Sequence, residues 1–428
     1  MNQPDTSDRP RERWWLYLVV PFGVLTAIGL VFTMAVIAFV GYKVEEADTK
    51  SQHEQAALQP FYTPPTSLPS GVGVLIRSEE IKGAAPKGSR VWRILYTSEH
   101  TDGTRTVSSG SVFVPDAPSV GVRPVLAWAH GTLGMADKCA PSRSNPQSDM
   151  QTWLPLAMAN GWIVVATDYA GFGTPGTLRY LIGVDAARDV INSVRAIRGF
   201  KPAEASNRVV VSGHSQGGQS SLFTAAEIGT YAPELELVAA TAAAPAAELN
   251  PLISQQWDKA VAWVIGAEVS VAWPKVYPDL DIQGTMTAVA RKQYRRIANM
   301  CVKPAAIEAL VRQKFLGQRF YATDVSKLPT WNRALREQTP KPLRRSIPTL
   351  IVQGMSDTVV LPNTTALLVE RWCAAGSNVS TIWLGDTTHP QVALVSGPTV
   401  VDWIAQRFAG VPTHTTCGLP QPVQPAKE

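Results

Sequence analysis

The sequence feature that most constrains this 428-residue chain is the pentapeptide Gly-His-Ser-Gln-Gly at residues 213–217, which directly follows the apolar run 208–212. A buried strand that stops at a G-x-S-x-G sequence and continues as a helix makes a strained turn, which holds the serine hydroxyl above the edge of a sheet. The Ala- and Ser-rich segment 216–228 is the expected helix. Ser215 is therefore a candidate nucleophile, with an ordinary glycine turn as the alternative.

The strand pattern around this turn predicts an α/β fold. A hairpin signal near residue 102 is followed by apolar runs that alternate with helical patterns, which is the order of an α/β-hydrolase sheet. The later runs are continuously apolar, as a parallel sheet covered on both faces requires. We expect eight mostly parallel strands flanked by helices, at 90–98, 105–114, 124–129, 162–168, 208–212, 237–243, 349–353 and 379–384.

About a hundred residues separate the strand that ends near 243 from the next strand. They contain helical patterns and many aromatic residues, and a structureless loop of that length would be unusual. The predicted organisation is therefore a core in two parts, 71–244 and 348–428, with a helical cap at 245–347 that covers the site. The alternative is that the inserted segment has no functional role.

The N-terminal region predicts membrane association. Residues 14–42 contain no charged side chain, and as a helix of ~1.5 Å per residue they would span about 43 Å, more than the ~30 Å hydrocarbon core of a bilayer. Three arginines precede the segment and three acidic residues follow it. This predicts a single-pass signal-anchor with residues 1–13 in the cytoplasm and the catalytic part outside the cell membrane. The alternative is a long cleaved signal peptide and a secreted protein. The proline-containing segment 43–70 is predicted to be an extended linker.

Charge and cysteine content exclude some functions. The chain has 39 Lys and Arg against 34 Asp and Glu, a net charge of +5 that we take as mild and unclustered, so nucleic acid is not an expected partner. The four cysteines follow an apparent export segment and predict two disulfides, with three possible connectivities. Since no C-x-x-C pair occurs, no thiolate zinc site is expected, and no cofactor is predicted.

A serine nucleophile needs a histidine base and a carboxylate that orients it. In α/β hydrolases the chain order is Ser, then acid, then His, and only His389 and His414 follow Ser215. His389 lies in the loop after the strand 379–384 and is the predicted base. His414 lies in a polar tail bounded by prolines and is discounted.

Two carboxylates compete for the role of the acid. Asp357 follows the buried strand 349–353 by one short loop, which places it at the matching height in the sheet. Asp386 precedes His389 by only three residues and would reach the far imidazole nitrogen with difficulty. Asp357 is the predicted acid, with a plain turn or N-cap carboxylate as the alternative.

The oxyanion of a tetrahedral intermediate needs backbone N–H donors. One is expected from Gln216, the residue after the nucleophile, and the other from Thr132 in the glycine-containing loop after the third strand. An ordinary glycine turn is the alternative for that loop. His130 and His214 come too early in the chain to be the base and are interpreted as packing or polar support.

The chain contains a set of short motifs, some of them discussed above: FYTPP at 61–65, AHGT at 129–132, DYAGFG at 168–173, GHSQGG at 213–218, QGxxD at 353–357 and His389. Taken together, these motifs resemble the secretory lipase family, of the Candida antarctica lipase A type, over residues 60–417. The resemblance implies an α/β-hydrolase core, a helical cap and hydrolysis of carboxylic esters of fatty acids, including triacylglycerols. It also implies the disulfides Cys139–Cys301 and Cys373–Cys417.

The predicted function is thus a serine ester hydrolase that uses Ser215, Asp357 and His389, with an ester or lipid substrate and a membrane partner through the N-terminal helix. Acyl transfer from the same acyl-enzyme is the nearest alternative. A serine peptidase of the same fold and an inactive membrane-tethered binding protein are the others.

Overall fold

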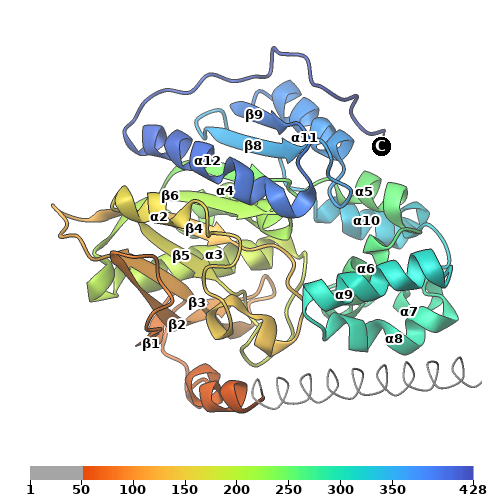
Figure 1. Cartoon of the computed structure of the whole chain (residues 1–428), viewed down its shortest axis with the longest axis horizontal. Helices are drawn as coiled ribbons and strands as arrows, with labels where there is room; N and C mark the ends of the chain where they lie inside the picture. Colours follow the sequence, from red (N-terminus) through yellow and green to blue (C-terminus); the bar gives the residue numbers. More distant parts are fainter. Residues whose placement is uncertain (1–51, 428) are drawn as a thin grey trace, which may run out of the picture. The chain divides into compact units, whose positions relative to one another are not determined.

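The computed structural model describes residues 52–427 (Figure 1). Its contacts divide the chain into Met1–Gln59 and Pro60–Glu428, and the fold belongs to the second unit. The predicted cytoplasmic segment 1–13 and transmembrane segment 14–42 lie outside the described residues. Within 52–427, no helix has both the length and the apolar character that a membrane span requires.

The predicted linker is partly helical. Its prolines favoured extended chain over 43–70, but residues 52–62 form a helix, so that expectation is wrong for this stretch. The last two helical residues, Phe61 and Tyr62, are buried. The Tyr62 hydroxyl shares a hydrogen bond of 2.8 Å with Ser142 Oγ. The packed body therefore begins near residue 60 rather than at 71.

Among the described residues, the sheet has nine strands rather than the predicted eight. The missed strand is β1, whose residues are half-buried or exposed, so it lacks the apolar run that revealed the others. The strands are β1 (Leu75–Glu80), β2 (Ser89–Glu99), β3 (Arg105–Pro115), β4 (Arg123–Ala129), β5 (Ile163–Thr167), β6 (Ala205–His214), β7 (Glu236–Ala243), β8 (Thr349–Gly354) and β9 (Val379–Leu384).

The strand order is β1-β2-β3-β5-β4-β6-β7-β8-β9. The pairs up to β3–β5 are antiparallel, and every pair from β5 to β9 is parallel. Because the carboxyl ends of parallel strands share one edge, the loops after β4, β6, β8 and β9 meet there. This mostly parallel sheet with interposed helices is the predicted α/β-hydrolase-like arrangement.

Helices cover the sheet in two groups (Figure 1). α3 (Gly183–Arg198) and α4 (Gln216–Tyr231) pack on each other and on the central strands. α2 (Leu154–Ala159) and α12 (Val392–Phe408) form the other group, which contacts the same sheet. α11 (Pro362–Ala374) connects β8 to β9. Coverage by both groups explains why the central parallel strands are mostly apolar.

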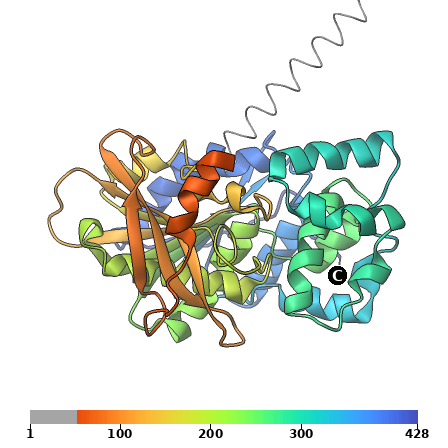
Figure 2. The same ribbon diagram turned by 90° about the horizontal axis from the view of Figure 1, so that it is seen from below.

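The segment between β7 and β8 is helical and lies beside the sheet in both views (Figures 1 and 2). A cluster of aromatic side chains, including Trp263, Trp273 and Trp331, is buried within it. Its helices are α5 (Leu249–Gln256), α6 (Val261–Ala272), α7 (Ile282–Thr285), α8 (Ala288–Ala298), α9 (Val302–Leu310) and α10 (Pro329–Glu337). The aromatic cluster gives this helical insertion a core of its own.

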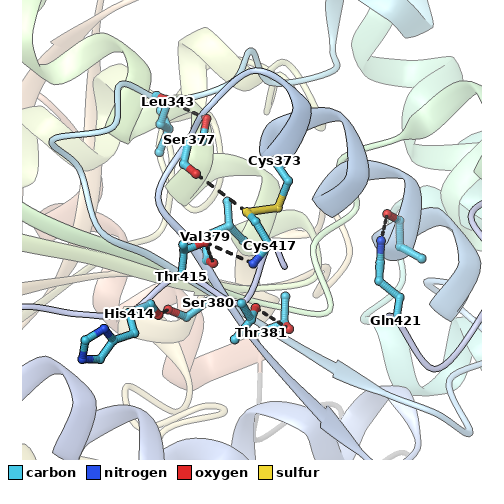
Figure 3. Close-up of a disulfide and its surroundings, with 12 residues drawn as sticks. Leu343, Cys373, Ser377, Val379, Ser380, Thr381, His414, Thr415, Cys417 and Gln421 are labelled. Carbon is cyan, nitrogen blue, oxygen red and sulfur yellow. Dashed lines mark hydrogen bonds between the residues drawn. A yellow bond between two sulfur atoms is a disulfide. The ribbon is translucent and has the colours of Figure 1, made fainter. Parts of the chain in front are cut away.

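Two disulfides join distant segments, Cys139–Cys301 and Cys373–Cys417, with the pairing that the family resemblance implies. The second one fastens the C-terminal tail to α11 (Figure 3). The tail also runs along the edge strand β9, where Ser380 Oγ donates to the carbonyl oxygen of His414 over 2.8 Å. The tail thus covers a strand edge that would otherwise be exposed, and His414 takes part in that cover.

Candidate active site

Ser215 occupies a strained turn between β6 and α4. Its backbone angles are φ 59° and ψ −119°, a conformation that L-residues rarely adopt. The two glycines of the pentapeptide allow this turn. A Cβ at Gly213 would overlap the carbonyl oxygen of Gly217, and a Cβ at Gly217 would overlap that of Ala129. The turn therefore needs both glycines, and it holds the serine at the carboxyl end of the central strand.

The structure brings the predicted nucleophile, base and acid together. His389 Nε2 lies 2.9 Å from Ser215 Oγ, and His389 Nδ1 lies 2.7 Å from Asp357 Oδ2. All three side chains are buried. An ionised carboxylate can only accept, so Nδ1 carries the proton toward Asp357 and the lone pair of Nε2 faces the serine hydroxyl. This is the arrangement in which an imidazole can take a proton from serine.

Asp357 is held by the chain around it. The backbone N–H groups of Val359 and Val360 donate to its Oδ1 over 2.8 and 2.9 Å, and Gln353 Nε2 donates to Oδ2 over 3.3 Å. Asp386, the competing carboxylate, is exposed on the loop before His389. The geometry therefore gives the orienting position to Asp357.

His214 contacts both the ring and the backbone of His389. The two imidazoles contact each other with their centroids 4.7 Å apart and their planes tilted by 35°. His214 Nε2 lies 3.0 Å from the backbone carbonyl oxygen of His389, to which its N–H donates. Burial, together with the nearby charge of His389, lowers the pKa of His214 to about 3. His214 is therefore neutral at ordinary pH and acts as a fixed donor.

The two expected oxyanion donors border the same pocket as Ser215. Gln216 is the first residue of α4 and Thr132 follows β4. A Cβ at Gly131 would lie 3.4 Å from Ser215 Cβ, so the loop after β4 reaches the serine. The Thr132 hydroxyl shares a hydrogen bond of 2.6 Å with Tyr180. Thr132 is thus held at the border of the pocket through its side chain.

Further contacts hold this loop in place. The His130 ring packs against Tyr169 and Phe172, and the Tyr169 hydroxyl donates to the His130 carbonyl oxygen over 3.1 Å. On the other side, the backbone N–H of Val302 donates to the carbonyl oxygen of Leu133 over 2.9 Å. The loop is therefore fastened both to the sheet and to the helical insertion.

An apolar pocket opens at the serine. It encloses about 670 Å³, part of which is open to solvent. Helices α5 and α6 supply much of its wall, through Leu249, Leu252, Ile253, Val261, Ile265 and Val269. A pocket of this character suits an apolar chain.

Several of these residues carried no recognisable signal in the sequence. Tyr180 belongs to no motif, and the support from Val359 and Val360 comes from backbone groups that every residue has. Gly131, by contrast, was marked by its place after the third predicted strand. Within 52–427, no group of three or more His, Cys, Asp or Glu side chains is arranged to bind a metal ion.

The chain is similar in sequence to proteins that are named as lipases. The chain is 25% identical over 393 residues to a probable inactive lipase of Mycobacterium tuberculosis, covering 86% of each protein. It is 24% identical over 392 residues to a secreted triacylglycerol lipase of Malassezia globosa, covering 84% of this chain and 82% of that protein.

Solved structures show the same fold. Candida antarctica lipase A in its closed state superposes with a TM-score of 0.67 at 18% identity, over 85% of this chain and 89% of that chain. The rice cell wall degrading esterase LipA of Xanthomonas oryzae gives a TM-score of 0.64 at 17% identity, over 79% and 99%. The secretory lipase model matches residues 142–416, well over half of the chain. The protein therefore belongs to the secretory lipase family.

Proposed function

We propose that this protein is a serine carboxylic-ester hydrolase of the lipase or esterase type. The single observation that carries the proposal is the hydrogen-bonded series Asp357, His389, Ser215, which ends at the mouth of an apolar pocket. Membership of the secretory lipase family supports the ester class.

In the proposed mechanism, Ser215 Oγ attacks the ester carbonyl carbon while His389 Nε2 takes the hydroxyl proton. Asp357 keeps the imidazole in the required tautomer and stabilises its positive charge. The backbone N–H groups of Thr132 and Gln216 stabilise the oxyanion. His389 then gives the proton to the leaving alcohol, and an acyl-enzyme forms. Water, activated by His389, attacks the acyl carbon and releases the acid and Ser215.

The pocket indicates which part of the substrate is recognised. Its apolar walls would take an acyl chain, and the nearby donors would take the carbonyl oxygen. A triacylglycerol or another fatty-acid ester fits this division, and a secreted relative is named a triacylglycerol lipase. A peptide substrate would need polar partners along its backbone. Among the pocket-lining residues of α5 and α6 only Gln256 has a polar side chain, and its Nε2 already donates to the carbonyl oxygen of Val359.

A relative named a probable inactive lipase raises the question of activity. In this chain the serine, histidine and aspartate are all present and within hydrogen-bonding distance, which favours an active enzyme. An acyltransferase would use the same acyl-enzyme, so product analysis with and without an added alcohol distinguishes it from a hydrolase.

The proposed organisation places the hydrolase core at about 60–244 and at 348–428, with the cap at 245–347. We further propose that residues 14–42 anchor the protein, with 43–59 as the connection. N-terminal sequencing of the native protein tests the anchor: a mature terminus after Tyr42 would mean cleavage and secretion.

The function is tested with p-nitrophenyl esters of graded chain length, triolein and a peptide anilide. We expect turnover of the esters and triolein but not of the anilide. A fluorophosphonate probe should label the native chain and the Ser396→Ala control, whose serine lies on α12, but not Ser215→Ala. Labelling of Ser215→Ala at another serine would contradict the assignment.

A further inference from the structure

Helix α9 and the π-helical turn that follows it, Val311–Phe315, present apolar side chains to solvent. Ile307 is 66% exposed, Leu310 46% and Phe315 80%. On the opposite side of the helix, Ala305 and Ala309 are buried. The exposed set, which we call the α9 apolar face, consists of Ile307, Leu310, Val311, Phe315 and Leu316. Contiguous exposed apolar groups of this kind mark an interaction site.

The sequence segment that contains this face is strongly basic. Residues 287–319 contain eight Lys and Arg and one acidic residue, a net charge of +7 against +5 for the whole chain. The remaining residues therefore carry a small net negative charge. The one acidic residue, Glu308, is already paired with Arg296 and Arg312. The expectation that the chain's positive charge is unclustered is wrong at this place. The basic residues are Arg291, Lys292, Arg295, Arg296, Lys303, Arg312, Lys314 and Arg319.

Lysines border the apolar face directly. Lys303 and Lys314 are exposed and stand four residues before Ile307 and four after Leu310, on the same side of the helix. A helix with an apolar face bordered by lysines is typical of segments that lie in the interfacial layer of a membrane.

The helix that carries the α9 apolar face begins close to the proposed reaction site. α9 begins at Val302, whose N–H donates to Leu133 in the loop that carries Thr132, and Cys301 is bonded to Cys139. α6, which lines the pocket, packs against both α8 and α9, and all three lie together in the helical insertion (Figure 1). A surface bound to α9 would therefore lie near the pocket.

We propose that the α9 apolar face, with its basic border, docks on an anionic phospholipid surface. The apolar side chains would enter the boundary of headgroups and acyl chains, and the basic residues would pair with the headgroup phosphates. A second copy of the chain is a poorer partner, since two surfaces of charge +7 repel each other. The inference gives the proposed hydrolase its lipid interface, but docking itself requires no turnover.

Hydrogen exchange tests docking on the full chain. The Ser215→Ala protein is incorporated in phosphatidylcholine vesicles with or without phosphatidylglycerol, and exchange of residues 302–316 is followed by mass spectrometry. We expect slower exchange with phosphatidylglycerol only, and loss of this protection at high salt, because screening shortens the range of the attraction. Residues 392–408 of α12 serve as the internal reference and should not change.

Charge reversal with a matched control completes the test. Lys303→Glu with Lys314→Glu should weaken docking at least about tenfold, since each basic residue near an anionic surface contributes about fivefold. Lys82→Glu with Lys87→Glu makes the same change of charge at exposed lysines outside 287–319 and should have no effect. Near-ultraviolet circular dichroism checks that both variants are folded.

Equal exchange in the two kinds of vesicle would overturn the proposal. So would protection that depends on protein concentration without lipid, which would indicate a second copy. Because docking is measured in Ser215→Ala, its failure is distinguishable from a failure of the hydrolase assignment, which turnover by the native chain tests separately.

Discussion

The edge of the sheet and the helical insertion differ in the kind of side chains that they bring to the pocket. At the sheet edge, Ser215, His389 and Asp357 are buried, mutually hydrogen-bonded and held by rigid strands. In the insertion, α5 and α6 form an apolar wall with few polar side chains. The contrast indicates that proton transfer depends on a few fixed positions, whereas substrate accommodation depends on the shape of an apolar surface.

The largest effect is expected at the nucleophile. Ser215→Ala should lower ester turnover by about 10⁴ or more, because no other group can form the acyl-enzyme. The fold should persist, since one buried hydroxyl is removed without adding volume. Steady-state hydrolysis of p-nitrophenyl esters measures the change, and near-normal activity would remove Ser215 from the mechanism.

The two competing carboxylates provide a matched pair. Asp357→Asn should lower turnover by about 10⁴, since an amide at this position favours the wrong imidazole tautomer. Asp386→Asn, at an exposed loop position three residues before His389, should have a small effect. Comparing kcat for the two variants decides the question. If Asp386→Asn proved to be the more damaging change, the acid would have been assigned wrongly.

His214 makes the sheet edge sensitive to acid. Its pKa is about 3 in the folded protein and 6.5 ordinarily, so below pH 6.5 the unfolded chain binds a proton that the folded chain does not. Stability should therefore fall as the pH falls from 6.5 toward 3, by up to about 1.4 kcal/mol per pH unit from this group.

The matched variant is His214→Gln, which keeps an N–H donor but does not titrate. Between pH 6.5 and 4, urea unfolding should show that the free energy of unfolding falls less steeply with falling pH in His214→Gln than in the native protein. The difference in slope should correspond to about one proton fewer taken up on unfolding. Parallel curves for the two proteins would show that His214 does not stay neutral on folding.

Substitutions in the helical insertion should have smaller effects on activity. Ile265→Phe narrows the pocket wall and should lower the ratio of long-chain to short-chain kcat/KM by about tenfold, a typical effect of changed apolar fit. Val271→Phe lies on the same helix but outside the pocket-lining residues and should leave the ratio unchanged. A large loss of kcat on short esters in Ile265→Phe would contradict the division between the two regions.

The central parallel strands were readily predicted because burial leaves apolar runs; β8 was predicted at 349–353 and is found at Thr349–Gly354, where every residue is buried. The residues proposed as nucleophile, acid and base were found for a related reason. Each follows such a strand, and parallel strands bring their following loops to one edge. The strand β1 and the helix at 52–62 were missed, since a half-exposed edge strand and a short helix before prolines have no such pattern.

The sequence by itself thus determined the α/β class, the strained turn at Ser215 and the family resemblance, because all three depend on local pattern and spacing. Only the tertiary structure decided that Asp357 rather than Asp386 meets His389, and that Tyr180 holds Thr132. It also decided that Lys303 and Lys314 border an exposed apolar face. These contacts join residues far apart in the chain or depend on which side of a helix is left uncovered, and both are set by packing.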